Sequence, residues 1–246
     1  GFHSLLIDDC VTLLAKVSAI ARGVRKTTSR LRGAVQLFSH THLVLYGGRS
    51  MDTVSQGDAE EQFSYLEQDL ERFSTASYCA ELVDRLTQPR ERQPNVFFLM
   101  LSTLRALKDG NPKLTARVFE LKLLDILGFC PSLTECVVGN HPYSIETGEQ
   151  QKRVWFSIEG GGVVCPACAE SCEGVRSFSP ATLGALGYFL RSPLEQAIKA
   201  KLTPQVLREL ASLLQDFLTY HGDVRPRSRS FLNAFRDEDA KNGHNK

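Results

Sequence analysis

Hydrophobic and polar positions alternate over short distances at the beginning of the chain. Residues 1–50 contain short β-branched or apolar runs that are separated by polar residues or glycine. Such runs are typical of β-strands. Several of them in so little sequence predict a small β-barrel of the OB-fold kind, which we assign to residues 1–57. Strands are expected at Ser4–Ile7, Val11–Leu14, Val17–Ala21 and His42–Tyr46, with Leu31–Phe38 pairing with Thr41–Tyr46.

After Gly57 the apolar spacing becomes that of helices. Phe63, Leu66, Leu70 and Phe73 lie three or four positions apart, so a long helix is expected to begin within the acidic segment Asp58–Asp69. Proline or turn residues mark the ends of the later helices. These are expected at Val96–Leu107, Leu114–Leu127, Pro180–Leu190 and Pro204–Tyr220.

The helical spacing is interrupted between residues 129 and 174, where prolines and most of the cysteines lie. Val154–Ile158 has the composition of a strand, and a glycine-rich turn follows it. The sequence therefore predicts an α+β protein with four parts. They are an OB-fold-like domain over 1–57, a mainly helical domain over 58–128 and 175–222, an inserted zinc-finger-like hairpin over 129–174, and a basic then polar, partly disordered tail over 223–246.

Charge is distributed unevenly along the chain. The whole chain holds 29 Lys+Arg and 28 Asp+Glu, yet no acidic residue occurs from Cys10 to Met51. An uncompensated basic segment among strands indicates a nucleic-acid groove, and a solvated surface is the alternative. No aromatic residue lies between Ser18 and Leu37, so we expect electrostatic binding with little base stacking there. The candidate DNA-binding residues are Lys16, Arg22, Arg25, Lys26, Arg30 and Arg32, and Arg49 is a further cation nearby.

The seven cysteines bear on the compartment in which the protein works. An odd number argues against a disulfide scaffold, and their clustering argues for a metal site in a reducing compartment. The sequence has no signal-peptide pattern, and no segment approaches the roughly 20 apolar residues that a membrane-spanning helix needs. We therefore expect a cytoplasmic protein, associated with the nucleoid through DNA.

The cysteine cluster contains the pattern of a structural zinc site. Cys165 and Cys168 form a CxxC pair, whose two sulfurs can bind one tetrahedral ion. The other expected ligands are Cys136 and Cys172, with Cys130 and His141 in reserve. A metal-free remnant of a finger is one alternative. A thiol redox motif is another, but the βαβ context of a thioredoxin-like site does not surround the pair.

No catalytic motif accompanies this cluster. The chain contains no GxxxxGK[ST], GxGxxG, GxSxG or HExxH sequence. We therefore expect a protein that is not an enzyme.

Four stretches together resemble the bacterial recombination mediator family RecO. They read VSAIARGVRKTTSRLRGAVQLFS, RVFELKLLDILGF, FSIEGGGVVCPAC and LRELASLLQDFLTYH, and they extend over nearly the whole chain. The segment from Lys16 to Gly33 and the segment from Phe119 to Gly128 are the most specific of these matches.

The resemblance implies an N-terminal OB-fold, a helical domain and a zinc finger. It also implies binding of single- and double-stranded DNA, annealing of complementary strands, and, with RecR and in some bacteria RecF, loading of RecA onto strands coated by single-strand-binding protein. Two departures are visible. The strand that begins the family's barrel is absent or cut short before Ser4–Leu14, and Gly139 stands where the family's second CxxC pair has its last cysteine.

Family members also bind the acidic C-terminal tail of single-strand-binding protein. Arg117, with Phe119 and Leu121 nearby, is our candidate for this contact, and a solvated helix-face arginine is the alternative. Two rival functions remain at this point. One is a protein–protein adaptor that uses the helical domain and the zinc hairpin without significant DNA binding, and the other is a thiol redox protein.

Overall fold

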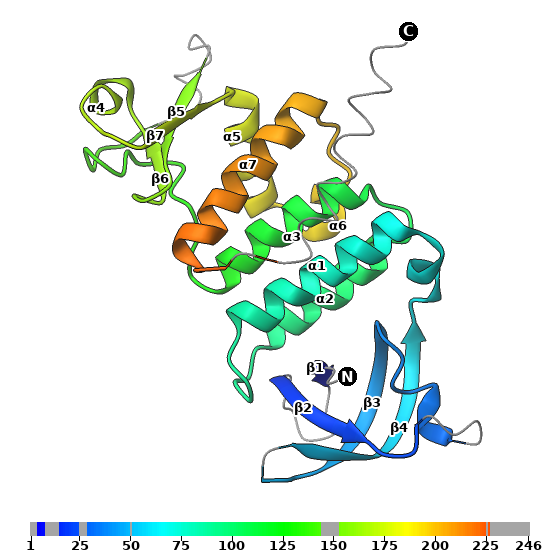
Figure 1. Cartoon of the computed structure of the whole chain (residues 1–246). Coiled ribbons are helices and arrows are strands. Elements are labelled where there is room, and N and C mark those ends of the chain that lie inside the picture. The colour runs from blue at the N-terminus through cyan, green and yellow to red at the C-terminus, as the bar shows by residue number, and fades with distance from the viewer. Residues whose placement is uncertain are drawn as a thin grey trace, which may run out of the picture. The chain divides into compact units, whose positions relative to one another are not determined.

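A computed structural model describes residues 4–7, 15–24, 29–49, 51–143, 153–224 and 226. The chain forms two compact units (Figure 1). The first comprises Gly1–Lys108 together with the chain from Pro226, and the second comprises Asp109–Arg225. The protein is thus of the mixed α+β class, with its longest strands near the N-terminus and helices through the remainder. None of the described helices is both long and apolar enough to cross a membrane.

The first unit contains a four-stranded sheet in the order β1-β2-β4-β3 (Figure 1). β2 pairs in parallel with β4, whereas the β1–β2 and β3–β4 pairs are antiparallel. The strands predicted at residues 4–7, 17–21 and 42–46 are confirmed, and the one predicted at Val11–Leu14 lies outside the described residues. The bounds are Ser4–Ile7 for β1, Ala15–Ala21 for β2, Ser39–Tyr46 for β3 and Asp52–Gln62 for β4.

The segment from residue 31 to 38 is not a strand, so the hairpin predicted between Leu31–Phe38 and Thr41–Tyr46 is wrong. It begins with a 3-10 turn, η1 (Arg30–Arg32), and continues through turns, while β3 pairs with β4. The physical reason lies in the spacing of Leu31, Ala34 and Val35. These side chains fall on one side of the turn and pack against the core formed by Val17, Leu43 and Val54.

β4 continues through Gly57 to Gln62, so the helix predicted to begin at Asp58 is wrong for residues 58–62. Backbone pairing with β3 extends through residues 58–62, and the charged side chains there lie at the surface or close to it. Gly57 permits the close approach of the covering segment. A Cβ atom at this position would lie 2.7 Å from Leu43 Cδ2 and 2.8 Å from Ala34 Cβ. The predicted domain boundary at residue 57 therefore falls within a strand.

Two long helices complete the first unit. The 3-10 helix η2 (Ser64–Gln68) leads into α1 (Leu70–Leu86), and α2 (Pro94–Ala106) follows. Asp69 is the N-cap of α1, where its carboxylate accepts hydrogen bonds from the N–H groups of Glu71 at 2.9 Å and Arg72 at 3.1 Å. α1 and α2 thus belong to the same compact unit as the sheet, and the domain boundaries given above stay predictions.

The second unit is built around three helices, α3 (Pro112–Ile126), α5 (Pro180–Arg191) and α7 (Pro204–His221), which pack against one another. Each begins with proline and is capped by the side chain of Asn111, Ser179 or Thr203. The short helix α6 (Leu194–Ala197) lies between α5 and α7 in sequence.

A small sheet in the order β6-β5-β7 lies between α3 and α5 in sequence. Its antiparallel strands are β5 (Val154–Ser157), β6 (Gly162–Val164) and β7 (Val175–Phe178), and the short helix α4 (Pro166–Ala169) follows β6. The predicted strand at Val154–Ile158 and the turn after it are confirmed.

The close approach at Gly57 gives a stability prediction. Gly57→Ala places a methyl group against Leu43 and Ala34, and we expect it to lower the free energy of unfolding by about 1–3 kcal/mol. Gly47→Ala is the matched control, because no atom lies within 4 Å of a Cβ there, and its effect should stay within about 0.5 kcal/mol. Urea titration of both variants measures the difference. Equal effects would show that the covering segment does not constrain residue 57.

Glu209 on α7 gives a pH prediction. Burial alone would raise the pKa of this carboxyl, but hydrogen bonds from Thr182 and from the backbone and hydroxyl of Ser179 lower it to about 2. The folded pKa lies below the unfolded value of about 4.3, so the resulting stability is present above that value and is lost as pH falls toward 2. Glu209→Gln should therefore flatten the dependence of unfolding free energy on pH between about 5 and 2, measured by urea titration at each pH. An unchanged slope would contradict the assignment.

Candidate nucleic-acid surface and metal centre

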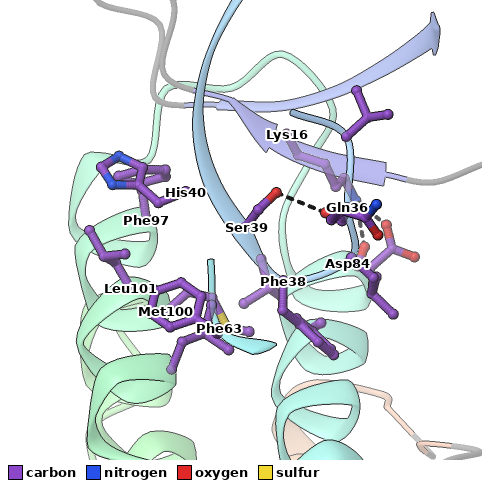
Figure 2. A pocket seen from close by; sticks show the side chains of 15 residues that line it. Lys16, Gln36, Phe38, Ser39, His40, Phe63, Asp84, Phe97, Met100 and Leu101 are labelled. Atoms are coloured by element: carbon purple, nitrogen blue, oxygen red, sulfur yellow. Dashed lines mark hydrogen bonds and ion pairs between the residues drawn. The ribbon is translucent and has the colours of Figure 1, made fainter. Parts of the chain in front are cut away.

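An apolar cavity of about 160 Å³ lies within the first unit (Figure 2). Phe38, Phe63, Phe97, Met100 and Leu101 form much of its wall. Two pairs of polar residues at its edge interact, Lys16 with Asp84 and Ser39 with Gln36. Figure 2 shows Ser39 Oγ, which donates to the Gln36 carbonyl at 2.8 Å. No nucleophile–base pair is seen among these bonded groups.

The first of the predicted DNA-binding residues, Lys16, lines this cavity. Its Nζ donates to the carbonyl oxygens of Asp84 at 2.5 Å and Thr87 at 2.7 Å, and lies 3.4 Å from the Asp84 carboxylate. A cation beside the last carbonyls of a helix satisfies their lone pairs and the helix dipole. Only 12% of the side chain is exposed. Lys16 therefore stabilises the end of α1, and its assignment as a DNA contact stays a prediction.

The described arginines of the basic segment lie at the surface. Arg22 is exposed in the turn after β2, Arg32 is exposed in η1, and Arg49 is exposed in the connection from β3 to β4. Within the described part of the chain, none of the three forms an ion pair. Arg30 contributes its backbone to η1, while Arg25 and Lys26 lie outside the described residues.

The structure pairs His40 and His42 with a carboxylate that the sequence did not indicate. Glu60, on the adjacent strand β4, places Oε2 2.9 Å from His40 Nδ1 and Oε1 2.6 Å from His42 Nε2. The hydrogen bond from His42 is the largest cause of the lowered pKa of Glu60. Both histidines of β3 therefore contact the same carboxylate at this acidic end of β4.

Cys136, His141, Cys165 and Cys168 form a candidate metal centre in the second unit. Their ligand atoms all lie within 4.8 Å of one another. Cys136 is in the loop after α3, Cys165 follows β6, and Cys168 lies in α4. Zinc favours thiolate and imidazole ligands in tetrahedral geometry, and this donor set fits that preference. It is the only such group among the residues that the structure describes.

Backbone N–H groups prepare two of these sulfurs to be thiolates. Burial raises the pKa of Cys136, but N–H groups, including those of Cys165 at 3.3 Å and Gly139 at 3.4 Å, outweigh it and the pKa is lowered. The N–H of Cys168, 3.4 Å from Cys165 Sγ, is the largest cause of the lowered pKa of Cys165. The hydrogen bond that the Cys168 thiol makes with Cys165 raises the pKa of Cys168 to about 11. Cys168 therefore holds its proton more tightly than Cys136 and Cys165.

His141 takes the place that we predicted for Cys172, which lies outside this group. Cys172 comes after the end of α4, and its Sγ contacts the Glu173 carbonyl at 3.6 Å. The ring of His141 is oriented by Nδ1, 3.2 Å from the Pro142 carbonyl, which leaves Nε2 as the ligand atom. The reserve ligand Cys130 is also outside the group.

Gly139 makes room for this imidazole. A Cβ atom at residue 139 would lie 2.7 Å from His141 Cδ2, 2.9 Å from its Nε2 and 3.1 Å from Cys168 Sγ. A side chain here would therefore point into the centre and compete with the ring. The absence of a side chain at residue 139 thus leaves the space that the His141 ring occupies.

The residues that we predicted to bind a partner's acidic tail lie in the interior of the second unit. Phe119 and Leu121 are fully buried. Arg117 is 12% exposed and pairs with the buried carboxylate of Glu120 at 2.8 Å. Phe119 and Leu121 therefore belong to the core, while the partly exposed Arg117 stays our predicted contact for the acidic tail.

Comparison with known proteins identifies the family. The family model described as Recombination protein O N terminal matches residues 13–63, and the one described as Recombination protein O C terminal matches residues 67–230. The DNA repair protein RecO of Pelotomaculum thermopropionicum is 37% identical over 96% of this chain and 91% of its own length.

Two further relatives agree. The DNA repair protein RecO of Symbiobacterium thermophilum is 37% identical over 93% of this chain and 91% of its own length, and that of Roseiflexus sp. is 38% identical over 92% and 78%. The chain therefore belongs to the RecO family of DNA repair and recombination proteins.

Proposed function

We propose that this protein is a non-enzymatic recombination mediator that binds single- and double-stranded DNA and anneals complementary strands. The observation that carries the proposal is the set of exposed arginines, Arg22, Arg32 and Arg49, in the connections of a small sheet within an acid-free stretch of sequence. Membership of a family of DNA repair proteins supports it. Arg25, Lys26 and Arg30 belong to the same proposed surface on the sequence pattern alone.

The proposed sheet domain is of the OB-fold type. Its edge strands β1 and β3 lie near each other, as closure of a small barrel requires. The parallel pairing of β2 with β4 in an otherwise antiparallel sheet is compatible with a Greek-key path. Such a barrel holds a nucleic-acid strand on its surface and leaves the interior packed.

Annealing in this proposal needs no bond chemistry. Two complementary strands repel through their phosphates, and cations that contact both strands reduce this repulsion. Arginine suits the role, because its planar guanidinium donates to two phosphate oxygens at once. Release of counterions makes such binding strongly dependent on salt.

We further propose that the protein works in the cytoplasm at the nucleoid. There it acts with RecR, and where present RecF, to load RecA onto strands coated by single-strand-binding protein. These partners follow from the family resemblance. For the tail of single-strand-binding protein we keep Arg117 as the candidate contact, and the buried Phe119 and Leu121 would support its helix from the core.

The metal in the second unit is proposed to be a structural zinc ion. Cys136, His141, Cys165 and Cys168 would hold it and fill all four tetrahedral positions with protein ligands. The ion would fix the loop after α3 to α4 and to the small sheet. It would leave no open position for catalysis.

The DNA surface is tested by removing its charge. Replacing Arg22, Arg32 and Arg49 by Ala should weaken binding to single-stranded DNA and reduce the log–log salt slope by about 2, from about 0.7 for each lost phosphate contact. Fluorescence anisotropy in a salt series measures both quantities. Removing the exposed cations Lys199, Lys201 and Arg208 of the second unit is the matched control and should change neither. Salt-insensitive partner binding with negligible DNA affinity in the unmodified protein would favour a protein–protein adaptor.

The zinc site is tested by moving its fourth ligand. His141→Ala should weaken zinc binding about tenfold or more, whereas Cys172→Ser should retain zinc, because only His141 belongs to the cluster. Adding Gly139→Cys to His141→Ala should restore binding, since a side chain at residue 139 points to the vacated position.

Competition with a chelating dye measures the zinc affinity of these variants, and the visible spectrum of the cobalt-substituted protein reports the number of sulfur ligands. Loss of zinc in Cys172→Ser with retention in His141→Ala would contradict the assignment.

A further inference from the structure

Three large apolar side chains are exposed to solvent on the outer face of the first unit's sheet. Ile20 is 40% exposed, Val44 is 42% exposed and Tyr46 is 68% exposed. Side chains alternate between the two faces of a sheet. The neighbouring residues Ala19, Ala21 and Leu45 pack into the core, so these three point the other way.

The pairing register brings these residues together from separate strands. Ile20 of β2 lies opposite Thr53 of β4, and Thr53 lies opposite Tyr46 of β3. Adjacent strands are about 4.8 Å apart, so Ile20 and Tyr46 are about 10 Å apart across the row, and Val44 is two positions from Tyr46 on the same strand. We call the three residues Ile20, Val44 and Tyr46 the apolar row. The phenol ring is its most exposed member.

The charges around the apolar row are positive. Arg22 comes directly after β2, and Arg49 lies three positions after Tyr46 in the connection to β4. The acidic residue nearest in the sequence, Asp52, is buried and accepts hydrogen bonds from the Gly48 N–H at 3.0 Å and from Arg90 at 2.7 Å.

The remaining acidic residues of β4 lie beyond the Val44 end of the apolar row, on the side away from Tyr46. Asp58 is opposite His42 and Glu61 is opposite His40, whereas Thr53 is opposite Tyr46. Negative charge is therefore displaced toward the end of β4 that is distant from Tyr46. A ligand at the Tyr46 end of the apolar row is therefore farther from these carboxylates than a ligand at Val44.

Single-stranded nucleic acid has the matching chemistry. Its phosphates are anionic and regularly spaced, and its unpaired bases present flat faces that stack on aromatic rings. In a duplex the bases are already stacked inside the helix, and an aromatic side chain on a surface cannot reach their faces. The apolar row therefore suits a single strand and distinguishes it from a duplex.

We propose that Tyr46 is a stacking platform for an unpaired base of single-stranded DNA, with Ile20 and Val44 supporting the base and Arg22 and Arg49 contacting the neighbouring phosphates. This inference rests on the proposed DNA binding and deepens it. Cations alone bind single strands and duplexes through the same phosphates. Tyr46 adds a contact that only the single strand can make.

The test compares Tyr46→Ala with Tyr46→Phe on three ligands, a thymine oligonucleotide, a duplex and an abasic strand of the same length. Tyr46→Ala should bind the thymine strand about tenfold or more weakly, because stacking on one aromatic ring contributes on that order. Tyr46→Phe keeps the ring and should stay within about twofold of the unmodified protein. The duplex and abasic affinities, and the salt slope on the thymine strand, should be unchanged in both variants.

Two controls separate stacking from damage to the fold. Urea midpoints should be equal for the two variants, since residue 46 is exposed. Tyr220→Ala removes a tyrosine that is 54% exposed in the second unit and should leave every DNA affinity unchanged.

Three outcomes would overturn the proposal. Unchanged thymine-strand affinity in Tyr46→Ala, with normal DNA binding by the unmodified protein, would reject stacking and leave the proposed function intact. In that case the apolar row would be reassigned as a contact surface for a protein partner. Equal losses on all three ligands would show that Tyr46 only positions the cations. Failure of the unmodified protein to bind any DNA would reject the proposed function itself.

Discussion

The packing of the segment 31–35 against β4 is the contact on which the first unit depends. Leu31, Ala34 and Val35 cover the core side of the sheet, and they come close because residue 57 has no side chain. This contact turns a run that reads locally as a strand into a compact turn. It leaves β3 to pair with β4 over its whole length, and it places Arg32 at the surface.

The basic segment shows that cations of one sequence pattern serve two roles. Lys16 lies on β2 beside the last carbonyls of α1, so its charge is used inside the unit. Arg22, Arg32 and Arg49 lie in turns between elements and remain in solvent. A turn at the end of a strand exposes a long side chain, whereas a strand position under a helix buries it. The proposed phosphate contacts therefore come from the connections of the sheet.

The candidate metal centre shows a similar dependence on local geometry. The α4 turn brings Cys168 to Cys165, and backbone N–H groups lower the pKa of Cys136 and Cys165. His141 reaches the centre because Gly139 leaves space for its ring. Cys172 is closer in sequence to the CxxC pair, yet it lies outside the group. Proximity along the chain is a weaker guide than the direction in which a turn points its side chains.

The sequence by itself determined those features that depend on local interactions. Proline at the first turn located α5 and α7, and apolar spacing indicated α3. The CxxC pair, the acid-free basic segment and the family resemblance were also readable without coordinates. Tertiary structure decided the features that depend on pairing between distant segments. Strand register brought Glu60 to His40 and His42, and it set Tyr46 in a row with Ile20. Packing of β2 against α1 placed the Lys16 ammonium beside the last carbonyls of that helix. The fold of the loop after α3 brought His141 to the three cysteines. Strand register and side-chain packing depend on contacts across the whole core, so they cannot be predicted from any short stretch of sequence.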